Sequence, residues 1–204
     1  MNWLLLTIIS AVLLTVQRLM QKKVLQYEHA TEYLTTYCLF MWVFLLPFFS
    51  FVDLNIKAIY ISLIYAISVV LTFAWILVIK AYRHMELSSV EPLRNLSPLV
   101  LLILAPLILK ENIDFTHFLG VILLLTAGYL LESLIQTGSL FKHKGLLKNK
   151  YTKYFLLAVL ITSVIAIFDK IILTHVKPFT FLFLLFFFAS INTLIIQSIM
   201  YKGI

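Results

Sequence analysis

Long apolar stretches with almost no charged residues alternate along this chain with short polar connections. An α-helix needs about 20 such residues to cross a hydrocarbon core of about 30 Å. The strands of a membrane β-barrel would instead carry polar residues at every second position, and stretches such as VILLLTAGYLL do not. The pattern therefore predicts an all-α, polytopic membrane protein. We expect seven transmembrane helices, at residues 2–17, 33–52, 58–79, 88–109, 115–135, 154–172 and 179–201.

Composition supports this class. Of the 204 residues, 62% are hydrophobic and 12% charged, whereas soluble domains have about 45–50% and about 25%. The mean hydropathy is +1.03. These values exclude a soluble globular protein. No basic residue precedes the first apolar stretch, and no small-residue cleavage site follows it, so we expect a retained helix rather than a cleaved signal peptide.

The net charge of +7 comes from basic residues in the connections. An excess of Lys and Arg on the inner side explains this distribution without a nucleic acid partner. Eleven basic residues fall on one side of the predicted membrane and four on the other. The eleven are Arg18, Lys22, Lys23, Lys80, Arg83, Lys142, Lys144, Lys148, Lys150, Lys153 and Lys202, and the four are Lys57, Lys110, Lys170 and Lys177. The count predicts a cell membrane protein with an external N-terminus.

A basic connection at residues 138–153 separates the first five predicted helices from the last two. We interpret it as a cytoplasmic loop. Beyond it, ITSVIAIFDKI at 161–171 aligns without gaps on ISAVLLTVQRL at 9–19. Five helices between the two starts would invert the second copy in the membrane, as in many transporters. We therefore predict a first repeat at residues 1–137 and the start of a second, incomplete copy at residues 154–204.

The densest polar group inside a predicted helix lies in the stretch 88–109. Glu91, Arg94, Asn95 and Pro98 occur at i, i+3, i+4 and i+7, and so share one helix face. Glu91 can pair with Arg94 one turn on. One interpretation is a polar cavity in which Arg94 and Asn95 bind an anionic or zwitterionic solute. The other is a structural ion pair near the helix start, with Arg94 extending outward to the interface.

Polar stripes on three other predicted helices are compatible with the same cavity, and that of the first helix includes Gln17 and Gln21. Tyr65, Ser68, Thr72 and Trp75 follow one another at spacings of three and four, and Tyr37 belongs to the second predicted helix. Single hydroxyls often bond to their own helix, and aromatic residues often anchor the interface, so packing is the alternative for each. The candidate substrate-binding residues are Arg94, Asn95, Glu91, Tyr65, Ser68, Thr72, Trp75 and Tyr37.

Catalytic chemistry has little support in the sequence. HExxH and GxSxG motifs do not occur, the five histidines stand singly, and Cys38 is the one cysteine. We therefore expect no catalytic residue, no metal site and no cofactor. An intramembrane enzyme is the less favoured alternative.

Residues 81–131, from AYRHMELSSVEPLRNLSPL to FLGVILLLTAGYLL, resemble the end of the first repeat in EamA-type members of the drug/metabolite transporter (DMT) superfamily. A short polar turn, a fourth helix with Ser and Pro, a GE-like turn and a glycine-bearing fifth helix follow in the same order. Lys110 and Glu111 hold the position of that second turn, with Lys in place of the usual Gly. DKIILTHVKPFTFLF at 169–183 is similar to the opening of the second repeat, with Lys170 and Pro178 on its usual Lys and Pro.

The resemblance implies a ten-helix carrier of two inverted five-helix repeats, which binds small polar metabolites in a central cavity with alternating access. Its partners would be a small-molecule substrate and the lipid bilayer. Because we predict seven helices, the alternative is an incomplete or accessory membrane protein without transport of its own, or one that forms a homo- or hetero-oligomer. The resemblance also favours an internal N-terminus, against the charge count.

Overall fold

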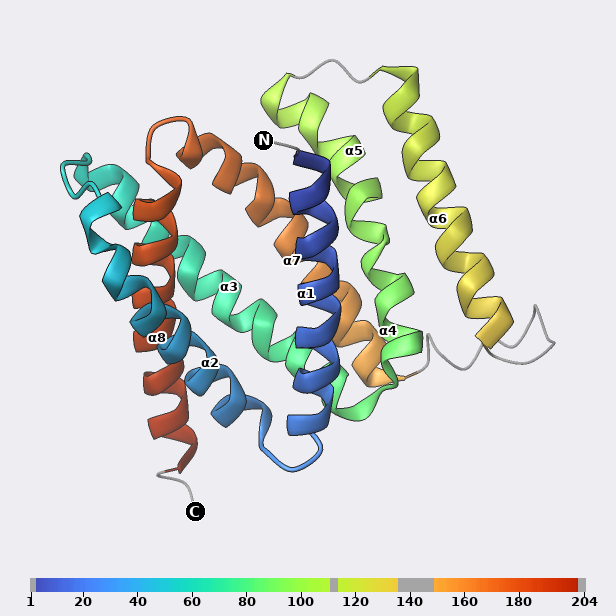
Figure 1. The fold of residues 1–204 in the computed structure, drawn as a ribbon, viewed down its shortest axis with the longest axis horizontal. Coiled ribbons are helices and arrows are strands. Elements are labelled where there is room, and N and C mark those ends of the chain that lie inside the picture. The colour runs from blue at the N-terminus through green and yellow to red at the C-terminus, as the bar shows by residue number, and fades with distance from the viewer. Residues whose placement is uncertain (1–2, 111–113, 136–148, 202–204) are drawn as a thin grey trace.

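The computed structural model describes residues 3–110, 114–135 and 149–201. Every regular element within these ranges is helical, so the expected all-helical class is confirmed. The elements, shown in Figure 1, are α1 (Trp3–Val24), α2 (Ala30–Leu45), the 3₁₀ segment η1 (Leu46–Phe51), α3 (Ala58–His84), α4 (Leu87–Arg94), α5 (Leu96–Leu109), α6 (Phe115–Ile135), α7 (Lys150–Leu173) and α8 (Pro178–Tyr201).

Six helical stretches in the described ranges are long and apolar enough to cross a bilayer. They are Leu4–Val24, Ala30–Phe51, Ala58–His84, Ser89–Leu109, Lys150–Leu173 and Pro178–Met200, and Phe115–Gly128 of α6 is a shorter apolar stretch. These lengths fit a polytopic membrane protein. The internal inverted repeat stays a prediction.

The first two helices begin or end at other residues than predicted. The first was expected to end at residue 17, but α1 continues to Val24, because its basic last turns bind other helices. The second was expected at 33–52. Instead α2 begins at Ala30, one residue after the capping residue His29, and ends at Leu45, where Pro47 introduces the 3₁₀ turns of η1.

The stretch expected at 88–109 is found as one membrane-length apolar stretch, Ser89–Leu109, but the structure divides its helix at Asn95 into α4 and α5. Pro98 has no N–H group to donate to the carbonyl of Arg94, so the helical ladder loses a bond beside the break. The side chain of Asn95 lies against α6. A Cβ atom added to Gly128 would come within 2.7 Å of Asn95 Nδ2. Gly128 therefore allows α6 to approach the point where the two helices meet.

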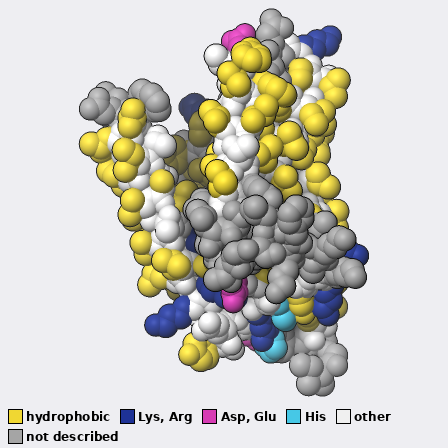
Figure 2. Space-filling view, turned by 90° about the vertical axis from the view of Figure 1, so that its right-hand side faces the viewer, with side chains coloured by type: hydrophobic (Ala, Val, Ile, Leu, Met, Phe, Trp, Pro, Cys, Tyr) yellow, Lys and Arg dark blue, Asp and Glu magenta, His cyan; other side chains and the backbone are white. Residues whose placement is uncertain are grey.

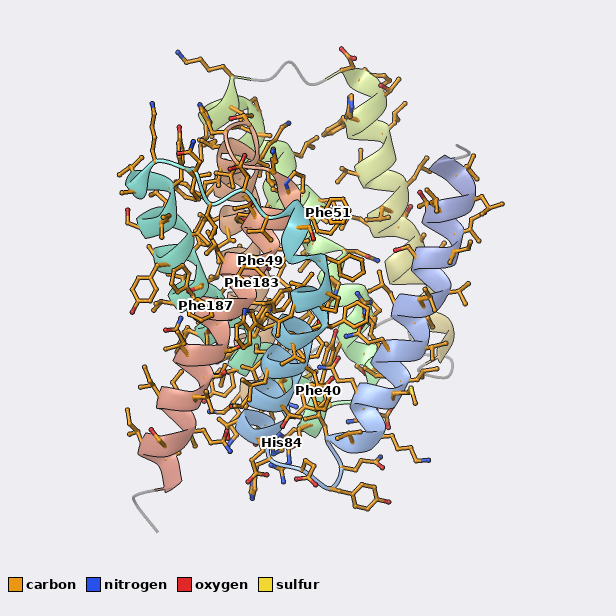
Figure 3. All side chains as sticks on the ribbon, turned by 60° about the vertical axis from the view of Figure 1, so that its left-hand side comes forward. Phe40, Phe49, Phe51, His84, Phe183 and Phe187 are labelled. Carbon is orange, nitrogen blue, oxygen red and sulfur yellow. The ribbon has the colours of Figure 1, made fainter. Side chains whose placement is uncertain are left out.

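The interior is built around α3, which packs against α2, α7 and α8. Ile64 and Leu71 of α3 share one apolar cluster with Ile165 of α7 and Leu184 of α8. A second cluster nearer the far end of α3 includes the fully buried Phe155 of α7. Figure 3 shows Phe49 close to Phe183, and Trp42 contacts the rings of Phe183 and Phe187. These contacts fix α2, η1 and α8 on one side of α3.

By contrast, α1 and α6 lie at the periphery. All described side chains of α1 from Leu4 to Val16 are exposed, and α6 contacts α4 and α5 at the edge of the molecule (Figure 1). On the face shown in Figure 2, hydrophobic side chains predominate in the upper part, below a few charged side chains at the top, and basic and histidine side chains gather toward the lower end. Such a band suits contact with hydrocarbon above a charged interface.

An ion pair joins two connections at one end of the bundle. Lys177 Nζ lies 3.0 Å from Asp53 Oδ2, and the backbone N–H of Asp53 donates to Thr180 Oγ1 of α8. The hydrogen bond from Lys177, supported by one from the backbone of Asn55, lowers the pKa of the Asp53 carboxyl below its usual value. The pair thus ties the η1–α3 connection to the start of α8.

We expect the contribution of this pair to stability to depend on pH. Because the folded-state pKa of Asp53 is lowered, the contribution is complete above the unfolded value of about 3.9 and disappears as pH falls through the folded value. Lys177→Met is therefore expected to lower the melting temperature at pH 7 by an amount that vanishes in acid. Lys57→Met, an exposed lysine nearby, is the control; a pH-independent difference for Lys177→Met would contradict the prediction.

The contact between Gly128 and Asn95 predicts unequal effects for two substitutions in α6. Gly128→Leu forces a side chain against Asn95, and overpacking of this kind costs about 1–3 kcal/mol. Gly120→Leu is the matched control, because no atom lies within 4 Å of an added Cβ. Thermal unfolding in detergent measures both, and equal melting temperatures would contradict the packing described here.

Candidate functional site

A cavity of about 390 Å³ lies between α1, α2, α3, α5 and α7, beside the end of α4. Its apolar walls include Trp75 of α3 and Phe155 of α7. Its polar lining includes Gln17, Arg18, Gln21, Tyr33, Tyr37 and Arg94. The cavity therefore combines two guanidinium groups with aromatic and aliphatic surface inside the helical bundle.

The last two turns of α1 supply one polar wall. Gln17 and Gln21 are four residues apart and so share a helix face with Arg18 between them. Lys22, one residue on, donates to the carbonyls of Tyr82 at 2.6 Å and Met85 at 2.8 Å, at the end of α3. Helix-terminal carbonyls lack intrahelical partners and carry partial negative charge. Lys22 therefore caps α3 and holds the end of α1 beside it.

A network of four side chains lies at the charged side of the cavity. Glu91 of α4 accepts hydrogen bonds from Arg18 at Oε2 and from Tyr82 at Oε1, the latter at 2.8 Å. Arg94 in turn donates to the Tyr82 hydroxyl. The Arg94 guanidinium carbon also lies 5.9 Å from the ring centres of Tyr82 and Phe155. Four elements, α1, α3, α4 and α7, thus meet around one carboxylate and two cations.

The network carries one more positive than negative charge. Arg94 Nε lies 3.6 Å from Glu91 Oε2, within ion-pair distance. That nitrogen is nevertheless buried without a hydrogen-bond partner among the described residues. A buried donor without a partner is costly, and a guanidinium suits a carboxylate or phosphate. The charged side of the cavity can therefore accept an anionic group.

The structure brings only some of the predicted site residues to this cavity. Arg94, Tyr37 and Trp75 line it, and Glu91 contacts Arg94 beside it. Asn95 faces Gly128 of α6 instead. The three candidates predicted on one helix face therefore separate where the helix is divided at Asn95.

The remaining candidates on α3 are accounted for by other contacts. Ser68 and Thr72 donate to the carbonyls of Tyr65 and Ser68 in their own helix, each at 2.7 Å, and Asn192 of α8 donates to Ser68. The ring of Tyr65 meets Phe188 of α8 edge-on. Among the residues lining the cavity, α3 is represented instead by Trp75, Val78, Ile79 and Tyr82.

Arg18, Tyr82 and Asp169 are polar residues of interest that the sequence pattern does not single out. Arg18 follows an apolar stretch, so it counts there as part of a connection. Asp169 of α7 is seven residues after the cavity-lining Thr162 and so shares its helix face, and its Oδ1 is buried without a hydrogen-bond partner among the described residues. A charged residue inside an apolar stretch is the signal for this carboxylate. No group of three or more potential metal ligands occurs in the part of the chain that the structure describes.

These observations define a polytopic helical membrane protein with a half-open, cation-lined cavity between its helices. The model of the EamA-like transporter family matches residues 1–132. The chain therefore belongs to the EamA-like transporter family, within the drug/metabolite transporter superfamily. No curated protein and no solved structure matches the chain.

The cap on α3 predicts different effects for two adjacent lysines. Lys22→Gln removes the cation from the α3 carbonyls, and we expect a loss of about 1 kcal/mol in unfolding free energy. It is also expected to speed amide hydrogen exchange in the last two turns of α1. Lys23→Gln is the control, since that side chain is exposed. Identical exchange in the two variants would show that Lys22 does not hold α1.

Proposed function

We propose that this protein carries a small anionic or zwitterionic metabolite across the cell membrane by alternating access, and that the solute binds in the cavity beside Arg18 and Arg94. One observation above all supports the proposal: two guanidinium groups and a single carboxylate border a cavity of about 390 Å³ in the helical bundle. Ionisable groups at membrane depth are costly and mark solute pathways by default. Family membership supports a transporter of the DMT type.

The chemistry of the cavity favours this class of solute. An anionic group of the solute would pair with the guanidinium groups, because neither charge is costly to bury once paired and hydrogen-bonded. Tyr37, Trp75 and Phe155 would contact its less polar part. The volume falls in the range of about 300–1,000 Å³ that is usual for small-molecule sites.

The broken helix at Asn95 supports a moving part next to the site. Discontinuous membrane helices often form the solute sites of secondary carriers, and a short helix can tilt independently of its neighbour. We propose that α4, which carries Glu91 and Arg94, moves relative to α5 during transport. We further propose that lipid covers the exposed apolar side chains of α1.

A transport assay tests the proposal directly. Purified protein in liposomes is supplied with a mixture of labelled organic acids, amino acids and amines, and the internal content is measured by mass spectrometry against protein-free liposomes. We expect accumulation of at least one anionic or zwitterionic compound, and at least a tenfold loss in Arg94→Leu.

Arg83→Leu is the matched control for that substitution. Arg83 bonds to His29 at the end of α3 and is not among the residues that line the cavity. We expect it to retain most of the transport. The proposal fails if Arg94→Leu transports as well as the unaltered protein, or if the accumulated compounds are cations alone.

A further inference from the structure

Glu91 forms ion pairs with the same two arginines that an anionic solute would bind. Arg18 and Arg94 both approach the same oxygen of Glu91, Oε2. Tyr82 holds the other oxygen, Oε1, at 2.8 Å. A carboxylate is thus already held by two cations and a hydroxyl at the edge of the cavity, and a solute carboxylate would present the same two oxygens to the same donors.

The two arginines belong to different elements. Arg18 is on α1 and Arg94 is on α4, one turn after Glu91. The ion pair between Arg18 and Glu91 therefore ties α1 to α4. The first four turns of α1 expose their side chains, and near its end Lys22 also anchors α1 to α3. Loss of the Arg18–Glu91 pair would thus remove this link between α1 and α4 and leave the contact of Lys22 with α3 in place.

We propose that Glu91 is an internal competitor for the solute: a monoanion that enters the cavity displaces the Glu91 carboxylate from Arg18 and Arg94 and releases α4 from α1. This inference rests on the proposed function, because it concerns the same cavity. Displacement of Glu91 leaves no uncompensated charge in the site. The two guanidinium groups exceed the single carboxylate by one charge, so one added monoanion neutralises the group, and Tyr82 stays available as a donor to the displaced Glu91.

The exchange makes Glu91 a specificity-determining residue. A neutral solute cannot replace a carboxylate on two guanidinium groups, since both cations would lose their counter-charge. A cation would be repelled by the net positive charge. Only an anion can neutralise the two guanidinium groups after Glu91 leaves them. Glu91 therefore selects for solutes that carry a negative charge.

The test measures binding of benzoate, a small aromatic monoanion, to purified full-length protein in nanodiscs. Trp75 lines the cavity and reports occupancy by fluorescence when Trp3 and Trp42 are replaced by Phe. We expect Glu91→Gln to bind benzoate at least about tenfold more tightly, because no internal carboxylate then competes for the two guanidinium groups. Arg18→Gln is expected to bind it at least about tenfold more weakly.

Two comparisons separate competition from a general change in the fold. Benzyl alcohol, the neutral counterpart of the probe, is expected to bind all variants equally. Glu28→Gln removes an exposed carboxylate outside the cavity and is expected to leave benzoate binding unchanged. If Glu91→Gln does not fold, Glu91→Asp serves instead, because its shorter side chain reaches the guanidinium groups less well and is expected to tighten benzoate binding by a smaller factor.

The outcomes distinguish this inference from the proposed function. Equal or weaker benzoate binding in Glu91→Gln, or in Glu91→Asp if that variant is used, would overturn the competitor role, even if the liposome assay detects transport that depends on Arg94. Tighter binding in the Glu91 variant with weaker binding in Arg18→Gln would support competition. In that case a lack of transport in liposomes would overturn only the carrier function.

Discussion

The pairing of charges inside helical stretches long enough to cross a membrane is the constraint on which this structure depends. A guanidinium group in hydrocarbon must find an opposite charge or a hydrogen-bond acceptor. Arg94 meets that need through Glu91 and Tyr82, and Glu91 in turn binds Arg18. Because these residues come from α1, α3 and α4, the interactions that neutralise Arg94 also hold three helices together at one side of the cavity.

Apolar packing provides the rest of the architecture. Membrane helices associate by close packing and by hydrogen bonds across helices, since lipid removes the usual hydrophobic driving force. The buried faces of α3 and α7 meet through small residues such as Ala74 and Ala158, both fully buried. Phe155 then fills the space beside the charged network. The closely packed part of the molecule is therefore the bundle of α2, α3, α7 and α8, and the polar site lies against it.

The break at Asn95 connects this packing with the chemistry of the site. Proline at residue 98 weakens the helix at the point where α6 approaches through Gly128. The consequence is that Glu91 and Arg94 belong to a short helix, α4, which contacts α3, α6 and α7 as well as α5. A solute that changes those contacts would act on α4 directly, which links binding to movement in the proposed carrier.

The sequence alone determined the helical membrane class, because the length and charge of an apolar stretch decide whether it can cross a bilayer. It also identified Arg94, Tyr37 and Trp75 as candidates, since polar and aromatic residues at helical spacing indicate a shared face. Sequence spacing could not show that Asn95 turns toward α6, that Ser68 and Thr72 bond within their own helix, or that Arg18 reaches Glu91 from 73 positions away. Those arrangements depend on which helices are neighbours and how each is rotated, and only the tertiary structure decides them.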